Sequence, residues 1–178
     1  LLIARMLWEK GIGEYVEAAK IIQAKYKNVE FQLLGFLNVK NNSAITENQM
    51  KEWVSKGLVS YLGVSDNTKE EIAEADCIVL PSFYREGTPR ALLEGASMAK
   101  PIITTDYVGC RDVVDNGING YLCKIRSSQD LADKMEMMLN LSEPDRKVMG
   151  KKSREKMIRQ FDEKIVIDKY LDSIKEIG

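Results

Sequence analysis

The segment from residue 77 to residue 105 constrains the fold of this chain more than any other. It begins with the apolar strand Cys77-Ile78-Val79-Leu80, passes through a turn rich in Gly and Pro, and continues as a helix that starts near Pro89. The helix breaks at Lys100-Pro101, and a β-branched strand follows and ends at Thr105. A strand, a helix and a second strand of these lengths favour a right-handed crossover within a parallel sheet.

The same alternation of strands and helices runs along most of the chain. The sequence predicts further strands over 1–4, 29–34, 59–63 and 121–123, and helices over 13–26, 47–56, 66–75, 130–141, 143–160 and 163–177. A length of 178 residues with 44% hydrophobic content suits one domain with its own core. We therefore expect a single α/β domain over residues 1–178, with a parallel sheet and helices on both faces.

Composition excludes several classes of function. The 26 basic and 27 acidic residues give a net charge of −1, which argues against a protein that binds nucleic acid through bulk charge. The absence of histidine excludes Ser-His-Asp, Cys-His and His-metal chemistry. Three cysteines without a C-x-x-C pair indicate reduced, packed thiols in a cytoplasmic protein and no metal site. No apolar run approaches the ~20 residues of a membrane span.

Two carboxylates, Glu86 and Glu94, stand just after the strand that ends at Leu80. The carboxyl ends of strands are where open α/β sheets bind ligands. The amides of Gly87 and Thr88 precede the helix and can hold a phosphate or a sugar hydroxyl. Acids at this spacing are also common in solvated helices, which is the alternative interpretation.

The loop after the first strand carries two cations, Arg5 and Lys10. A dinucleotide fingerprint would need glycine where the chain has Val16, and no G-K-[ST] sequence is present, so we exclude NAD and a P-loop. A guanidinium and an ammonium together can neutralise a diphosphate. The alternative is that both side chains are simply exposed to solvent.

The run Glu86-Gly87-Thr88-Pro89-Arg90-Ala91-Leu92-Leu93-Glu94, followed by Gly95-Ala96-Ser97-Met98-Ala99 and Pro101-Ile102-Ile103, resembles the E-x7-E segment of the retaining glycosyltransferases of family 4. Those enzymes have the GT-B fold, in which two Rossmann-like domains face each other across a cleft. The resemblance covers nearly the whole chain and implies the C-terminal, donor-binding domain. Because the chain begins without Met and inside a strand, we expect it to be part of a longer protein whose N-terminal acceptor domain is absent.

The resemblance implies a role for each candidate residue. Arg5 and Lys10 would hold the diphosphate of a nucleotide sugar, most simply a UDP-sugar, without a metal cofactor. Glu86 would contact the donor sugar near the reaction centre, and Glu94 would bind both ribose hydroxyls. Val64 and Ser65 would meet the base through their main chain. The donor-binding set is Arg5, Lys10, Val64, Ser65, Glu86, Gly87, Thr88, Pro89, Arg90 and Glu94, with Glu86, Arg5 and Lys10 as the catalytic groups.

The expected partner is a glycan or lipid-linked acceptor, bound mainly by the missing domain. Residues 146–160 carry seven basic side chains, so contact with an anionic inner membrane leaflet is one interpretation and a solvated helix face is the other. Other functions remain open: a catalytically silent domain that binds nucleotide or mediates assembly, a GT-B-type nucleotide-sugar epimerase, or a phosphorylase. The E-x7-E context argues against the epimerase and the phosphorylase.

Overall fold

The structure is a computed structural model that describes residues 1–177. Within this range, six short strands alternate with helices along the chain. The strands are β1 (Leu2–Ile3), β2 (Gln32–Leu34), β3 (Ser60–Gly63), β4 (Ile78–Leu80), β5 (Ile102–Thr105) and β6 (Gly120–Cys123). Each overlaps a strand predicted from the sequence.

The helices also follow the predicted pattern. They are α1 (Ile12–Lys25), α2 (Glu47–Ser55), α3 (Thr68–Glu74), α4 (Arg90–Ser97), α5 (Ser128–Leu139), α6 (Glu143–Gln160) and α7 (Glu163–Ile177), with the 3-10 turns η1 (Trp8–Lys10) and η2 (Arg111–Val113). Capping side chains mark where several of these helices begin. The side chains of Thr46, Ser127 and Ser142 each accept a hydrogen bond from an amide in the first turn of the following helix. Helix α4 begins at Arg90, and Pro89 precedes it with extended backbone.

The strands form a parallel sheet in the order β3-β2-β1-β4-β5-β6. Leu2 is paired with Leu33 across β1 and β2, and Ile78 with Ile102 across β4 and β5. The two three-stranded halves are joined where the Val79 amide donates to the Leu1 carbonyl oxygen at 2.9 Å. This is the strand order of doubly wound nucleotide-binding folds, and the order reverses between β1 and β4. The α/β prediction is therefore confirmed.

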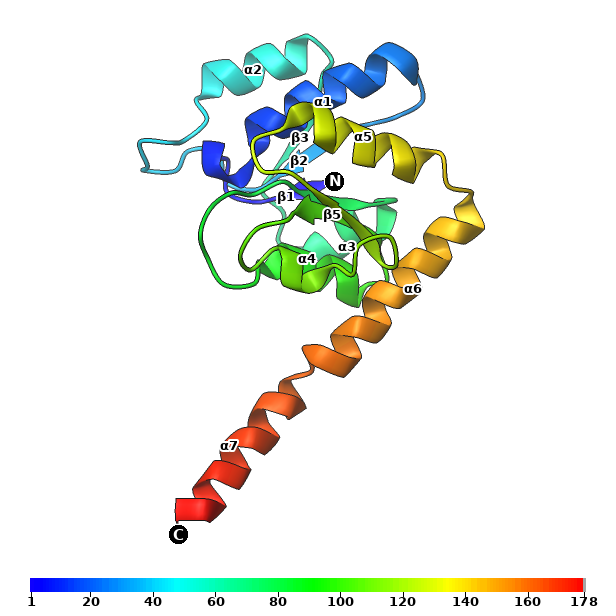
Figure 1. Cartoon of the computed structure of the whole chain (residues 1–178). Coiled ribbons are helices and arrows are strands. Elements are labelled where there is room, and N and C mark those ends of the chain that lie inside the picture. The colour runs from blue at the N-terminus through cyan, green and yellow to red at the C-terminus, as the bar shows by residue number, and fades with distance from the viewer. Residues whose placement is uncertain (178) are drawn as a thin grey trace.

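Helices cover both faces of this sheet. Figure 1 shows α1, α2 and α5 on one side and α3, α4 and α6 on the other. Helix α5 follows the last strand and returns to pack along α1, while α6 packs against α4. For the helices that connect two parallel strands, the side follows from the right-handed crossover. No helix within residues 1–177 is long and apolar enough to cross a membrane.

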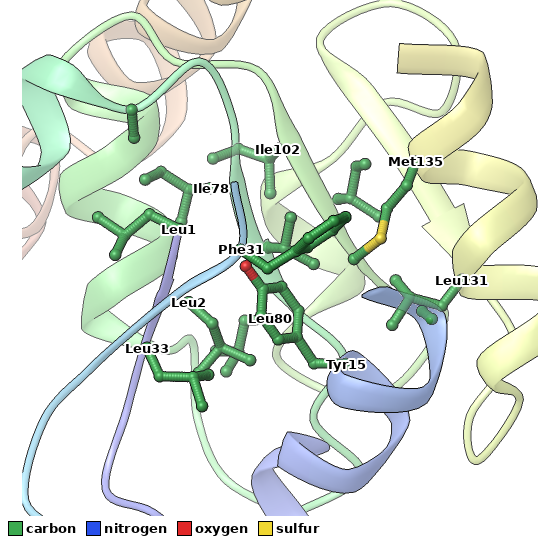
Figure 2. Packing of buried hydrophobic residues seen from close by; sticks show 14 of the residues in the cluster. Leu1, Leu2, Tyr15, Phe31, Leu33, Ile78, Leu80, Ile102, Leu131 and Met135 are labelled. Atoms are coloured by element: carbon green, nitrogen blue, oxygen red, sulfur yellow. The ribbon is translucent and has the colours of Figure 1, made fainter. Parts of the chain in front are cut away.

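The core extends over both faces of the sheet, with buried residues from α1 and α5 on one side and from α3, α4 and α6 on the other. Figure 2 shows Tyr15 of α1 beside Phe31, with Leu131 and Met135 of α5 close by. The rings of Tyr15 and Phe31 meet edge to face, 5.7 Å apart between centroids. The Tyr15 hydroxyl donates to the Gln32 carbonyl oxygen at 3.3 Å, and burial raises the pKa of this phenol. The buried residues of α1 recur at helical spacing, so the helix is amphipathic and packs its apolar face into the core.

Helix α6 is fixed to the domain by buried polar contacts. Lys156 is 5% exposed and its Nζ lies 2.7 Å from Asp115 Oδ1, while the Ser153 hydroxyl donates to the Asn119 carbonyl oxygen at 3.0 Å. Gly150 lies so close to Ala99 that a Cβ on it would stand 2.0 Å from the Ala99 carbonyl oxygen. Helix α7 continues beyond α6, away from the sheet (Figure 1).

These contacts bear on the basic stretch 146–160. Lys156 is buried in its ion pair, and Arg154 donates to the Ser97 carbonyl oxygen at 2.9 Å. Arg146, Lys147 and Lys152 also have partners in or beside α6, at Leu141, Glu143 and Glu155. In the part of the chain that the structure describes, only Lys151 and Arg159 among the seven lack a hydrogen bond or ion pair. Lys156 and Arg154 thus attach α6 to the domain, whereas Lys147 and Lys152 are in exposed pairs of the kind that contribute little. Contact of this stretch with a membrane stays a prediction.

Candidate functional site

The loops that follow β1 and β4 meet at the switch point of the sheet. The Phe83 amide and the Ser82 hydroxyl both donate to the Glu9 carbonyl oxygen, at 2.9 and 3.2 Å. Gly11 has φ +76°, and a Cβ added to it would stand 2.2 Å from the Pro81 carbonyl oxygen. The glycine therefore allows both a left-handed backbone and direct contact between the two loops.

The central pair of the site is Lys10 with Glu86. Lys10 Nζ is in direct contact with Glu86 Oε1, although the residues are 76 positions apart in the chain. The Lys10 side chain is 9% exposed and the Glu86 side chain 29%. The Tyr84 ring lies 5.1 Å from the ammonium and adds a cation–π contact. Both charged residues were predicted site residues, but neither their ion pair nor Tyr84 was.

Arg5 extends from the same loop as Lys10. It is exposed to solvent, as the alternative interpretation of the sequence had it, and in residues 1–177 its guanidinium has no hydrogen-bond or ion-pair partner. Lys10 is buried, so that alternative holds for Arg5 alone. An unpaired guanidinium in the loop that carries a buried lysine is free to bind an anionic ligand.

Buried hydroxyls of β5 hold the loop that carries Glu86. The Thr105 hydroxyl donates to the Ser82 carbonyl oxygen at 2.5 Å, and the Thr104 hydroxyl donates to the Leu80 carbonyl oxygen at 2.6 Å. Both threonines and Ser82 are fully buried. The sequence reasoning missed this support, although two threonines at the end of a buried strand were a visible signal, since a buried hydroxyl needs a partner.

A second support comes from the loop after β5. Gly109 has φ +79°, and a Cβ there would stand 2.6 Å from the carbonyl oxygens of both Glu86 and Gly87. On the remaining side, the Arg126 guanidinium lies over the Phe83 ring at 4.6 Å. Strand β5, the loop after it and the loop after β6 thus each contact the segment from Ser82 to Gly87.

The segment around the start of α4 contains the other predicted ligands. The amides of Gly87 and Thr88 donate no hydrogen bond to any residue that the structure describes, so they are available to a ligand. Glu94, on the second turn of α4, is paired with Arg90 at 3.4 Å. The Arg90 side chain is almost fully exposed and the Glu94 side chain is 40% exposed, so this pair contributes little stability and Glu94 can exchange its partner for a ligand.

The two residues predicted to meet a base lie after the edge strand β3. Val64 is 52% exposed, and the Ser65 hydroxyl accepts a hydrogen bond from the Asn67 amide at 3.1 Å. They share the carboxyl edge of the sheet with the Lys10 and Glu86 loops, two strands from β1. No contact in the described structure joins them to Lys10 or Glu86, so their role stays a prediction.

Of the three cysteines, Cys110 lies nearest the site: burial raises the pKa of its thiol, and hydrogen bonds with Thr104 and Thr105 act in the opposite direction. Burial raises the pKa of the Cys77 and Cys123 thiols to about 12, so both are protonated at neutral pH. Cys77, Cys110 and Cys123 are all free thiols. Among the described residues, no group of three or more Cys, Asp and Glu side chains is placed to hold a metal ion.

The support from Thr105 can be tested on stability. Thr105→Val keeps the shape of the side chain but leaves the buried Ser82 carbonyl oxygen without its donor, so we expect a loss of about 1–3 kcal/mol in the free energy of unfolding. Thr105→Ser keeps the hydroxyl and should lose less than the valine variant. Urea unfolding of both variants measures the difference, and equal losses would mean that the hydroxyl is not important.

The strand order and the position of these loops place the molecule among the doubly wound α/β domains that bind ligands at a switch point. Comparison with known proteins identifies the particular group. Residues 1–156 match the model of the family described as Glycosyl transferases group 1, and the chain belongs to that family.

Individual relatives agree with this assignment. The chain is 32% identical over 171 residues to N,N'-diacetylbacillosaminyl-diphospho-undecaprenol alpha-1,3-N-acetylgalactosaminyltransferase of Campylobacter jejuni, and this match covers 96% of the chain but 43% of that enzyme. Among solved structures, Anabaena Alr3699/HepE in complex with UDP has a TM-score of 0.84 at 18% identity, over 98% of this chain and 48% of that one. The C-terminal domain of LpcC, a Glycosyl Transferase Group 1 family protein from Francisella tularensis, has a TM-score of 0.73 at 21% identity, over 90% of this chain and 83% of that one.

Proposed function

We propose that the chain is the donor-binding, C-terminal domain of a retaining glycosyltransferase of family 4 with the GT-B fold. The observation that carries this proposal is the buried Lys10 beside Glu86 at the switch point of the sheet. Membership of the group 1 glycosyltransferase family and the E-x7-E segment from Glu86 to Glu94 support it. The chain spans less than half the length of the Campylobacter relative, so the other half of the cleft is proposed to lie in a preceding domain.

The donor is proposed to be a UDP-sugar. Arg5 and Lys10 bind its diphosphate and stabilise the negative charge that develops there as the bond to the sugar breaks. The free amides of Gly87 and Thr88 support the sugar or the phosphate, and Glu94 accepts hydrogen bonds from the two ribose hydroxyls. Val64 and Ser65 contact the base through the main chain. Solved neighbours in this fold, such as HepE, have been crystallised with UDP.

Glu86 is proposed to contact the donor sugar. Its loop is fixed from three sides, so the carboxylate is delivered to one place at the mouth of the site. A carboxylate in that position can accept hydrogen bonds from sugar hydroxyls and orient the anomeric carbon toward an acceptor. Pro89 and Arg90, at the start of α4, complete the wall next to it.

The acceptor is proposed to be a growing glycan on a lipid carrier. The Campylobacter relative is named for a diphospho-undecaprenol-linked acceptor and for the transfer of N-acetylgalactosamine. By analogy, we propose transfer of a hexosyl or N-acetylhexosaminyl group at the cytoplasmic face of a membrane. The acceptor pocket itself is assigned to the N-terminal domain.

A panel of UDP-, GDP- and ADP-sugars tests the proposal on this chain. Calorimetry should detect binding of UDP and of one UDP-sugar, with weaker or no binding of the GDP and ADP series. If the chain binds none of these ligands, the alternative function is favoured, in which the domain mediates assembly and binds no nucleotide. A fragment that binds donor but lacks the acceptor domain should transfer no sugar.

Metal dependence gives a further prediction. Because two cations supply the counter-charge for the diphosphate, and the sequence has no D-x-D triplet and no histidine, UDP binding should be unchanged by EDTA. The measurement is the UDP dissociation constant in EDTA and in Mg²⁺ or Mn²⁺. A strict requirement for either ion would contradict the assignment of Arg5 and Lys10.

A further inference from the structure

We propose, on the basis of the function proposed above, that Glu86 acts as an internal counter-ion that competes with free UDP for Lys10. Through this competition the site discriminates between the intact sugar donor and the nucleotide product. Glu86 is then a specificity-determining residue for two ligands that share the same nucleotide.

The first step of the argument is the burial of Lys10. Its side chain is 9% exposed, and the groups that face its ammonium are the Glu86 carboxylate and the Tyr84 ring. A buried ammonium is costly unless an anion compensates it. In the empty site Glu86 is that anion, so the site is electrostatically satisfied before any ligand arrives.

The second step concerns free UDP. A diphosphate that reaches Lys10 must displace Glu86 or share the ammonium with it, and both groups are negatively charged. Like charges brought together in this way are unfavourable, and a displaced Glu86 has no other cation in contact with it in the described structure. Free UDP must therefore overcome the attraction between Lys10 and Glu86 in order to bind.

The third step concerns the intact donor. A UDP-sugar brings hydroxyl groups to the position beside Lys10, and these can donate hydrogen bonds to the Glu86 carboxylate. The displaced carboxylate then has new partners, and hydrogen bonds to a charged group are among the stronger ones. The sugar compensates for the broken pair in a way that UDP alone cannot.

The competition favours turnover. When the sugar leaves for the acceptor, Glu86 loses its partners in the ligand and the Lys10–Glu86 contact can form again. Re-formation of the pair stabilises the empty site relative to the UDP complex and so promotes product release. The loop that carries Glu86 is held in place by Thr105 and Gly109, so the carboxylate stays within reach of Lys10 throughout.

The test is the affinity of Glu86→Gln for UDP and for UDP-N-acetylgalactosamine, measured by calorimetry on the 178-residue chain. If Glu86 only contacted the sugar, the Glu86→Gln variant would bind UDP as tightly as the parent does. Competition predicts instead that the variant binds UDP about tenfold more tightly or better, since the like charge is gone and Lys10 lacks a counter-ion. The dissociation constant of UDP divided by that of the UDP-sugar should fall by at least the same factor.

Asp106→Asn is the matched control. Asp106 lies at the same edge of the sheet and is paired with Arg111 at 3.3 Å, so the substitution removes one negative charge without touching Lys10. UDP affinity should stay within about twofold of the parent. Equal tightening by Asp106→Asn and Glu86→Gln would show a general charge effect and overturn the proposal.

Glu86→Asp guards against a failure of the glutamine variant to fold. It keeps the charge but withdraws the carboxylate from Lys10, so UDP should bind more tightly than to the parent, by less than in Glu86→Gln. Unchanged or weaker UDP binding in both variants would overturn the inference while leaving the donor-binding function in place. If the parent and all variants bind no nucleotide, both the inference and the proposed function are wrong.

Discussion

Arg5→Ala is expected to weaken UDP binding by about 2–5 kcal/mol, or roughly thirtyfold to several thousandfold. The guanidinium is exposed and has no hydrogen-bond or ion-pair partner among residues 1–177, so it is free to bind the diphosphate, and a bound ligand would remove the contact from water. For the same reason the protein should lose no internal contact, and its free energy of unfolding should change by less than about 0.5 kcal/mol. Calorimetry and urea unfolding measure the two quantities.

Arg111→Ala provides the control for charge at the same sheet edge. Arg111 is exposed and is paired with Asp106, so its removal should alter UDP affinity by no more than about twofold. If Arg5→Ala also leaves UDP affinity unchanged, Arg5 does not belong to the site and the diphosphate must be held elsewhere.

Gly11→Ala is the second substitution with a large expected effect. The methyl group would meet the Pro81 carbonyl oxygen at 2.2 Å in a backbone with φ +76°, so the β1 and β4 loops would have to separate. Left-handed backbone costs about 1–2 kcal/mol and overpacking about 1–3 kcal/mol, which together predict a loss of roughly 2–5 kcal/mol in the free energy of unfolding. UDP affinity should fall as well, because Lys10 and Glu86 belong to the loops that separate.

Gly57→Ala isolates the backbone contribution to this effect. Gly57 has φ +67°, and no atom lies within 4 Å of an added Cβ. Its substitution should therefore cost only about 1–2 kcal/mol. Equal losses of stability in the two variants would mean that the Pro81 loop moves aside without cost, and that the contact does not hold the site together.

The sequence predicted the helices of this fold more closely than the strands. Helices α6 and α7 begin and end at the predicted residues, and the other helices differ by one or two residues at most of their ends. The capping residue Ser142 marks the start of α6. Strand β6 begins one residue earlier than predicted, whereas the first four strands are shorter than predicted, and β2, for example, begins at Gln32 and not at Val29. Part of that difference is a matter of definition, since the Phe31 carbonyl oxygen still accepts a hydrogen bond from the Ser60 amide.

The sequence predicted that Arg5, Lys10 and Glu86 lie at one edge of the sheet, because each follows an apolar strand and the carboxyl ends of parallel strands share one edge. That these residues bind a ligand stays a prediction, and their contacts with one another were not predicted. Which strands are neighbours is decided by packing over the whole sheet, so the Lys10–Glu86 ion pair between β1 and β4 could not be read from spacing. Tyr84 and Thr105 were missed for the same reason, because their roles depend on partners from other segments.

The two site loops are joined by the hydrogen bonds that the Phe83 amide and the Ser82 hydroxyl donate, and this joint has a consequence for how such a protein can evolve. Both of these hydrogen bonds end on the carbonyl oxygen of Glu9, a backbone atom that every amino acid possesses. No substitution at position 9 can delete that acceptor, whereas Ser82 must keep its hydroxyl and Gly11 must stay a glycine. Mutations between Tyr84 and Thr88 could thus change which sugar is accepted while the joint is inherited intact. Insertions or deletions in either loop, which shift the backbone itself, are the changes that selection should remove.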